Sequence, residues 1–134
     1  KETGHIYILT SGSKKEEIAS LKNLFKIGYS STTVQERIKN AENEPTYLMA
    51  PVKIESSWVC YNMNARKFES LIHQFFGHTC LEVDVFDNEG KRHNPREWFI
   101  VPVDVIEQAI LLIMSGEIVN FKYDSANEII VDRE

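Results

Sequence analysis

Five polar residues have side chains that could act together on a phosphate ester: Tyr7, Lys26, Arg37, Glu69 and His73. A single carboxylate can hold a Mg²⁺ ion that keeps most of its waters, and the metal can stabilise charge on a leaving oxygen. A guanidinium can bind a non-bridging phosphate oxygen. A lysine or tyrosine of lowered pKa could help to deprotonate water. The set therefore suits hydrolysis of a phosphodiester bond, provided that the fold brings these side chains into one pocket.

Each of these residues also has an ordinary structural explanation. A tyrosine on a strand is commonly a half-buried aromatic, and Lys26 and Arg37 could simply face solvent. Glu69 and His73 lie four residues apart, so they could form an exposed contact along one helix. The elements that position the five side chains decide between the two interpretations.

Four apolar segments rich in β-branched and aromatic residues are predicted as strands: residues 5–10, 24–30, 52–60 and 97–101. The first two most simply pair antiparallel, because the short connection between them, a helical excursion or a mobile insertion, leaves no room for a full crossover helix. Tyr7 and Lys26 lie on these two strands. In the right register both project from the same face of the sheet, because side chains alternate along a strand.

Two of the three predicted helices position the remaining candidates. Residues 31–43 have a capping-box spacing and an apolar stripe, with Arg37 at the edge of that stripe. Residues 65–76 have a strong apolar face and place Glu69 and His73 on its flank.

Caps and turns define the remaining boundaries. Asn64 can cap the helix over 65–76, and Gly77 is a suitable residue to follow its last turn. A strongly buried helix follows Pro102 and is closed by Gly116, and residues 121–131 form either a last strand or a tail. A turn is also predicted over 87–90.

The order β-β-α-β-α-β-α predicts an α+β fold, a small and mainly antiparallel sheet flanked by helices. No repeat or linker divides the chain. We therefore expect a single domain over residues 1–134, with a core at about 4–115 and a C-terminal extension at 116–134.

Composition restricts the classes of function. The chain has 134 residues, of which 43% are hydrophobic, and this excludes global disorder. No apolar run is long enough to span a membrane and no signal peptide heads the chain, so we expect a cytoplasmic protein without a membrane partner. The isolated Cys60 and Cys80 fit a reducing cytosol and make a structural zinc site improbable. Because the sequence starts at Lys1 and not at methionine, we expect either a domain excised from a longer protein or a processed chain.

The net charge of −5 argues against a free-standing nucleic-acid binder. The charge is uneven, however: residues 1–67 have 10 basic and 7 acidic side chains, whereas residues 68–134 have 5 and 13. Tyr7, Lys26 and Arg37 lie in the basic half. DNA therefore remains a possible partner, bound weakly and with help in targeting.

An ordered set of motifs contains the candidate residues: GHIY at 4–7, KIG at 26–28, Arg37, ESLIH at 69–73 and EWF at 97–99. Together they resemble the GIY-YIG endonuclease superfamily, and the KIG and EWF motifs resemble its phage- and restriction-associated branch. The resemblance covers residues 4–115 and implies a GIY-YIG-like fold.

The resemblance also implies a role for each matching residue. Tyr7 would position or activate the attacking water, and Arg37 would stabilise the developing phosphate charge. Glu69 would be the single carboxylate ligand of Mg²⁺ or Mn²⁺. His73 would assist proton transfer or contact phosphate, and Gly28 would permit close packing behind the site. Lys26 stands where most of the superfamily has a second tyrosine, the proposed general base.

The leading prediction is a divalent-metal-dependent DNA endonuclease that cleaves in a single hydrolytic step. It would be the nuclease module of a larger protein, fused to or partnered with a DNA-targeting domain. One alternative is a catalytically silent nucleic-acid-binding module on the same fold, favoured by Lys26 in place of the tyrosine. Another is a protein-interaction domain that uses the apolar helix segment 110–114. Glu97 is expected to be either a second acidic group of the site or a structural residue.

Overall fold

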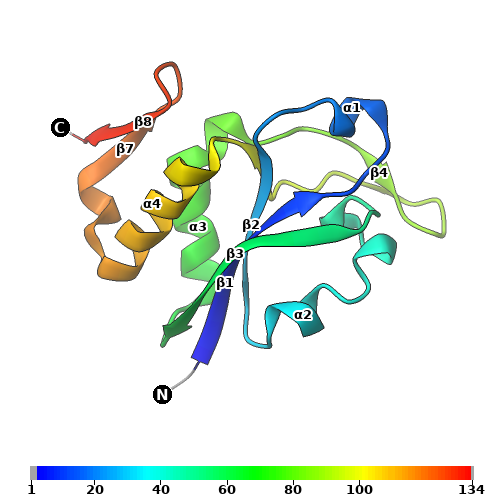
Figure 1. Cartoon of the computed structure of the whole chain (residues 1–134), viewed down its shortest axis with the longest axis horizontal. Coiled ribbons are helices and arrows are strands. Elements are labelled where there is room, and N and C mark those ends of the chain that lie inside the picture. Colours follow the sequence, from blue (N-terminus) through cyan, green and yellow to red (C-terminus); the bar gives the residue numbers. More distant parts are fainter. Residues whose placement is uncertain (1–2, 134) are drawn as a thin grey trace.

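A four-stranded antiparallel sheet forms the centre of the computed structural model, which describes residues 3–133 (Figure 1). The strand order is β3-β1-β2-β6, with bounds β3 Val52–Tyr61, β1 Thr3–Ser11, β2 Leu24–Ser30 and β6 Trp98–Ile100. β6 is short and pairs only with the first three residues of β2, as far as Lys26. The second half of β2 therefore extends beyond the end of its neighbouring edge strand.

The register of β1 and β2 sorts their side chains onto two faces. Tyr7 lies opposite Gly28 and Leu9 lies opposite Lys26, so these residues share one face. The prediction that Tyr7 and Lys26 project from the same face is confirmed. The residues that alternate with them, Ile6, Ile8, Phe25 and Ile27, project from the other face and are buried.

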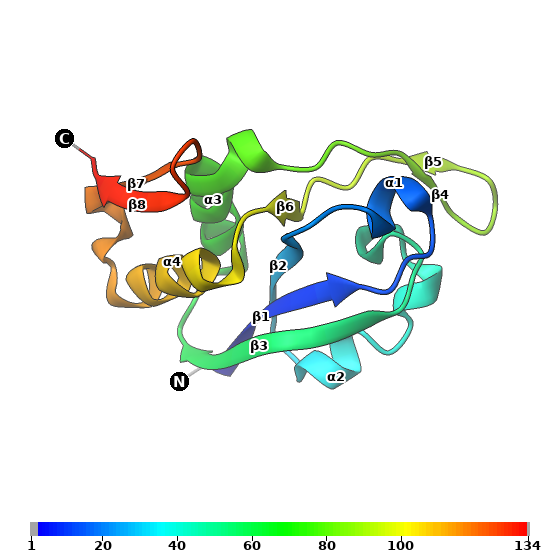
Figure 2. The same cartoon turned by 45° about the horizontal axis from the view of Figure 1, so that its top comes forward.

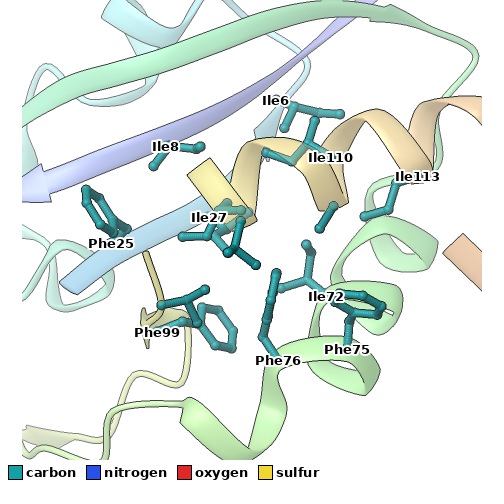
Figure 3. Close-up of a cluster of buried hydrophobic side chains, with 14 of the residues drawn as sticks. Ile6, Ile8, Phe25, Ile27, Ile72, Phe75, Phe76, Phe99, Ile110 and Ile113 are labelled. Atoms are coloured by element: carbon teal, nitrogen blue, oxygen red, sulfur yellow. The ribbon is translucent and has the colours of Figure 1, made fainter. Parts of the chain in front are cut away.

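Two long helices, α3 (Ala65–Phe76) and α4 (Val103–Ser115), pack on the apolar face and form the main core with it (Figure 3). Phe76 and Phe99 are almost fully buried there, together with Ile106 and Ile110 of α4. Burying one such side chain contributes about 1.5–3 kcal/mol. This cluster is therefore the main source of stability of the sheet.

The opposite face of the sheet has a smaller cover, which consists of α2 (Val34–Arg37) and the 3₁₀ turns Ala41–Asn43 and Pro45–Tyr47 (Figure 2). Val34, Ala41 and Tyr47 pack here against Tyr7 and Leu9. The helix predicted over residues 31–43 belongs to this cover, and the structure forms only a short part of it.

Only the first turn of that predicted helix forms. Thr33 is its N-cap, as the capping-box spacing predicts: its Oγ1 atom accepts a hydrogen bond from the backbone N–H of Glu36 at 3.2 Å. The helix nevertheless ends at Arg37: Ile38 and Asn40 leave the helical conformation, and the chain continues as the 3₁₀ turn Ala41–Asn43. The chain turns instead and places Ala41 in the small core with Tyr7.

The helix over 65–76 forms with the predicted bounds, and the Oδ1 atom of Asn64 accepts a hydrogen bond from the N–H of Lys67 at 3.0 Å. Gly77 does not take the left-handed conformation (φ −57°), and the chain continues into the 3₁₀ turn Gly77–Thr79. Gly116 has a φ of 82° and closes α4 as predicted.

Shorter elements complete the structure. α1 (Glu16–Ala19) lies between β1 and β2, in the segment expected to be a helical excursion or an insertion. β4 (Val85–Phe86) and β5 (Arg92–His93) form a hairpin around the predicted turn, and β7 (Phe121–Asp124) and β8 (Ile129–Asp132) form another.

The prediction of an α+β fold with a mainly antiparallel sheet flanked by helices is therefore confirmed. Within residues 3–133 no helix combines the length and the hydrophobicity needed to cross a lipid bilayer.

Candidate active site

Lys26 is buried in the polar face of the sheet, where its side chain is only 4% exposed. Its Nζ atom lies 2.9 Å from Oε1 of Glu97. The same atom lies 5.4 Å from the ring centroid of Tyr7 and 5.3 Å from that of Tyr47, within the range of cation–π attraction. A carboxylate and two aromatic rings therefore compensate the buried ammonium for the water it has lost.

Arg37 lies beside this cluster, at the last residue of α2. Its guanidinium carbon is 5.2 Å from the ring centroid of Tyr47, and its Nη1 atom donates a hydrogen bond to Oε1 of Glu44 at 3.3 Å. The hydroxyl groups of Tyr47 and Tyr7 are 3.4 Å apart. The structure therefore brings together Tyr7, Lys26 and Arg37, which sequence analysis placed on three separate elements.

Gly28 makes this arrangement possible. It lies opposite Tyr7 in the β1–β2 register, and a Cβ atom at this position would overlap the Tyr7 ring. The absence of a side chain lets the phenol lie flat across β2. The close packing expected at Gly28 is present in the structure.

Glu97 precedes β6 at the edge of the sheet and is held by both its backbone and its side chain. Its carbonyl oxygen accepts a hydrogen bond from the N–H of Ile27 at 3.4 Å. Oγ1 of Thr46 donates to Oε1 of Glu97 at 2.6 Å, and Nε1 of Trp98 donates to the carbonyl oxygen of Thr46 at 3.0 Å. These bonds tie the 3₁₀ turn Pro45–Tyr47 to the edge of the sheet.

Glu69 and His73 approach from the opposite face, because α3 packs on the apolar side of the sheet. They reach the site around the free edge of β2, beyond the end of β6. There they border a cavity of about 60 Å³, which is lined by Ile27, Glu69, Ile72, His73, Glu97 and Phe99. The His73 ring packs edge-on against Phe99, with 5.3 Å between the ring centroids. Glu97 thus belongs to both the lysine cluster and the cavity, and it connects the two groups of predicted residues.

The pKa of Tyr7 is affected by charges from both groups, the lysine cluster and the residues at the cavity. Burial raises the pKa of the Tyr7 phenol, and the negative charges of Glu97 and Glu69 raise it further. The hydrogen bond with Tyr47 and the charge of Arg37 oppose this shift without cancelling it. The lowered pKa that a tyrosine base would need is therefore not present, and Tyr7 remains a neutral phenol at neutral pH.

The residues fit a hydrated divalent cation better than a fully enclosed one. Nowhere in the described part of the chain do three or more His, Cys, Asp or Glu side chains form a group that could hold a metal ion. Mg²⁺ does not require such a cage, because it is commonly held by one or two carboxylates together with waters and substrate phosphates. Glu69 is exposed at the cavity and forms no ion pair within residues 3–133. Glu69 can therefore provide the one carboxylate that such an ion needs.

Sequence analysis did not identify Tyr47 and left the role of Glu97 open. Tyr47 lies in a 3₁₀ turn, outside any periodic pattern, so its position depends on how the chain folds back after α2. Glu97 could be recognised as an acidic residue before a strand, but its contact with Lys26 depends on the long-range pairing of β6 with β2.

Comparison with known proteins corrects the family assignment. The family model of the T5orf172 domain matches residues 4–114. The prediction that the chain is a member of the GIY-YIG superfamily is wrong on this finding, and a GIY-YIG-like topology and a phage-related origin are not supported. The resemblance relied on five short motifs, whereas the family match extends over most of the chain.

The chain is also 43% identical over 115 residues to the "Uncharacterized protein YeeC" of Bacillus subtilis (strain 168). The match covers 83% of this chain but 30% of that relative, so the chain spans less than a third of its length. No solved structure matches the chain. The chain belongs to the T5orf172 domain family, a family of nuclease-like, DNA-binding domains.

Proposed function

We propose that this chain is a divalent-metal-dependent endonuclease domain that hydrolyses a phosphodiester bond of DNA. The observation that supports the proposal best is the meeting of two groups at the free edge of β2. One group has the cations Lys26 and Arg37, and the other has Glu69 and His73 at the rim of a small cavity. Phosphodiester hydrolysis needs cations near the phosphate oxygens and a metal-binding carboxylate near the leaving oxygen.

Arg37 is the residue that binds the phosphate in this proposal. Its side chain is 38% exposed, so a phosphate can reach it from solvent. A guanidinium has five N–H donors, and the described contact with Glu44 uses Nη1 alone. The remaining donors can hold a non-bridging oxygen while the Tyr47 ring keeps the group in place.

Lys26 and Tyr7 act without giving up a proton. The ion pair with Glu97 keeps an ammonium charge beneath the site, where low exposure strengthens its field. The neutral phenol of Tyr7 can donate its proton in a hydrogen bond to a phosphate oxygen or accept one from water. His73 is exposed at the cavity and can contact phosphate or transfer a proton.

Glu69 would hold Mg²⁺ or Mn²⁺, which supplies positive charge for the leaving oxygen when bound. The residues that line the cavity include no serine or cysteine, so the proposal is direct hydrolysis without a covalent enzyme intermediate. Because the matched relative is much longer than this chain, we propose that an additional DNA-targeting segment or partner compensates for the weak DNA affinity of an acidic domain. The free thiols of Cys60 and Cys80 are consistent with the proposed cytoplasmic location.

The proposal is tested by incubating the chain with plasmid and branched DNA in Mg²⁺ or Mn²⁺. Cleavage by the wild type is expected to be lost on metal chelation and in Glu69→Ala, and to fall by about 100-fold or more in Arg37→Ala. Glu89→Ala and Arg92→Ala are matched controls, because both residues are exposed on the β4–β5 hairpin. Cleavage that survives both site substitutions would contradict the assignment of the site.

The same experiment distinguishes the second candidate function, a silent nucleic-acid-binding module. The feature that favours it is the absence of a three-ligand metal cluster in the described residues. Salt-dependent DNA binding by the wild type, with no cleavage in either metal, would select this function.

A further inference from the structure

Glu97 occupies the junction of two cavities beside the proposed site. On one side it borders the cavity of about 60 Å³ that it shares with Glu69 and His73. On the other side it borders a larger cavity of about 220 Å³, next to Thr46 and the segment 93–95. The smaller cavity has room for about two waters at about 30 Å³ each, and a carboxylate is among the polar partners that a water needs.

The side chain of Glu97 is fixed through one oxygen only. Lys26 and Thr46 both contact Oε1, at 2.9 and 2.6 Å. Within residues 3–133 no hydrogen-bond donor contacts Oε2. The carboxylate is therefore held in place by protein groups through Oε1, while Oε2 remains available to a small molecule at the junction of the two cavities.

Other groups at the site are less suited to receive a proton from water. The Nζ atom of Lys26 is engaged by Oε1 of Glu97, and Tyr7 is a neutral phenol because burial raises its pKa. Glu69 forms no ion pair within the described chain, so its carboxylate is available to a metal ion. The charge of Glu97 is already balanced by Lys26, which makes it a poorer metal ligand.

We infer that Glu97 is a catalytic residue, and that Oε2 binds and deprotonates the water that attacks phosphorus. This inference rests on the proposed function of the site. Although burial raises the pKa of Glu97, the attraction of Lys26 and the hydrogen bond from Thr46 outweigh that effect, and the pKa lies below its ordinary value. Glu97 is therefore a carboxylate at neutral pH.

In the step itself the water oxygen forms a bond to phosphorus and one water proton passes to Oε2 of Glu97. The bond from phosphorus to the leaving oxygen breaks, and its electron pair goes to that oxygen, which takes a proton from solvent water. Glu97 then releases its proton to solvent and returns to the carboxylate. The step forms one P–O bond and breaks one, and it needs no further reactant.

The test compares Glu97→Gln with the wild type in single-turnover and steady-state cleavage of DNA. Glutamine can still turn its amide oxygen toward Lys26 and Thr46, so the contacts of Oε1 are retained, but its NH₂ group cannot accept a proton. We expect kcat to fall by about 100-fold or more, the usual contribution of a positioned base, with KM changed by less than about twofold. Glu89→Gln is the matched control, because Glu89 lies in the exposed turn of the β4–β5 hairpin, and it should match the wild type.

Chemical rescue separates this role from a purely structural one. Glu97→Ala removes the carboxylate, and added formate should restore part of its kcat while leaving that of Glu69→Ala unchanged. If Glu97→Ala does not fold, Glu97→Gln, which keeps the size of the side chain, still decides the question. A kcat within about threefold of the wild type in Glu97→Gln would overturn the inference.

Failure of the inference and failure of the proposed function give different results. If wild-type protein cleaves DNA, Glu69→Ala is inactive and Glu97→Gln is fully active, only the role of Glu97 is wrong. If the wild type cleaves no DNA in either metal, the proposed function fails and the inference with it.

Discussion

The two faces of the central sheet are built from the same strands but hold very different contents. The face covered by α3 and α4 packs mainly aliphatic and aromatic side chains, among them Ile6 and Phe76. The face covered by α2 and the turn Pro45–Tyr47 holds a buried ammonium, an ion pair and two phenols in contact. Strand alternation allows this division, because neighbouring residues such as Ile6 and Tyr7 are sent to opposite sides.

The comparison shows where stability arises and where it is reduced. Buried charges and hydroxyl groups cost free energy unless they are fully paired, whereas apolar burial is favourable at nearly every position. The apolar face can therefore stabilise the sheet while the polar face keeps an arrangement that is suited to chemistry. Four substitutions or titrations test this division, and they are described from the largest expected effect to the smallest.

Truncation in the apolar face should have the largest effect on stability. Phe76 is fully buried and packs against Phe99 and Tyr123. Phe76→Ala should lower the free energy of unfolding by about 3–5 kcal/mol. Denaturant titration measures this loss, and any DNA cleavage per folded molecule should remain as in the wild type. A loss below about 1 kcal/mol would contradict the view that this face stabilises the sheet.

A methyl group at Gly28 should affect the polar face with a smaller loss of stability. Gly28→Ala would place a Cβ atom in the Tyr7 ring and push the phenol away from Tyr47. We expect a loss of about 1–3 kcal/mol from overpacking. DNA cleavage should fall more than in Phe76→Ala, although that variant is less stable. Gly77→Ala is the control, because a Cβ atom there meets nothing within 4 Å.

The Lys26–Glu97 pair should show coupling without a large net contribution to stability. Breaking a fully buried pair costs about 3–5 kcal/mol, but Glu97 is 40% exposed, so Lys26→Met should cost about 1–2 kcal/mol. The double variant Lys26→Met/Glu97→Gln should recover part of this loss, because no unpaired charge remains. Denaturant titration of the four proteins in the cycle gives the interaction energy. If the stability losses of the two single variants simply add up in the double variant, the two side chains do not interact directly.

The division between the faces also explains how much could be predicted from the sequence. Alternation and helical periodicity record local burial, so the bounds of β2 and α3 were predicted correctly, as was the shared face of Tyr7 and Lys26. The early end of α2 was missed because Ala41 continues an apolar stripe but reaches the core through a turn. The local sequence pattern shows that Ala41 is buried, but it does not show whether a helix or a turn buries it.

The candidate site was predictable in part for the same reason. Side-chain types and their strands indicated Lys26 and Arg37, but the approach of Glu69 around the edge of β2 depends on where β6 ends. Tyr47 and the contacts of Glu97 arise from pairings between distant residues: Tyr47 meets Tyr7, 40 positions away, and Glu97 meets Thr46, 51 positions away. Short motifs also indicated the wrong family, because a few matching positions say little about the rest of a chain.

The smallest expected effect is a pH dependence that distinguishes the polar face from the rest of the molecule. The pKa of Glu97 is lowered in the folded chain relative to an ordinary glutamate, which titrates at about 4.3. A lowered pKa means that the unfolded chain binds the proton more tightly than the folded chain does. Glu97 therefore stabilises the fold above its unfolded pKa, and this stabilisation is lost as the pH falls through the folded pKa.

Asp87 and Asp124 also have lowered pKa values, because His93 and Asn127 respectively donate hydrogen bonds to them. These two groups are the same in the wild type and in Glu97→Gln, so their effects cancel when the two proteins are compared. The difference in melting temperature between the proteins should therefore be largest near neutral pH and should shrink below about pH 4. A difference that stays constant or grows in acid would show that the Lys26 ion pair does not stabilise the carboxylate form of Glu97.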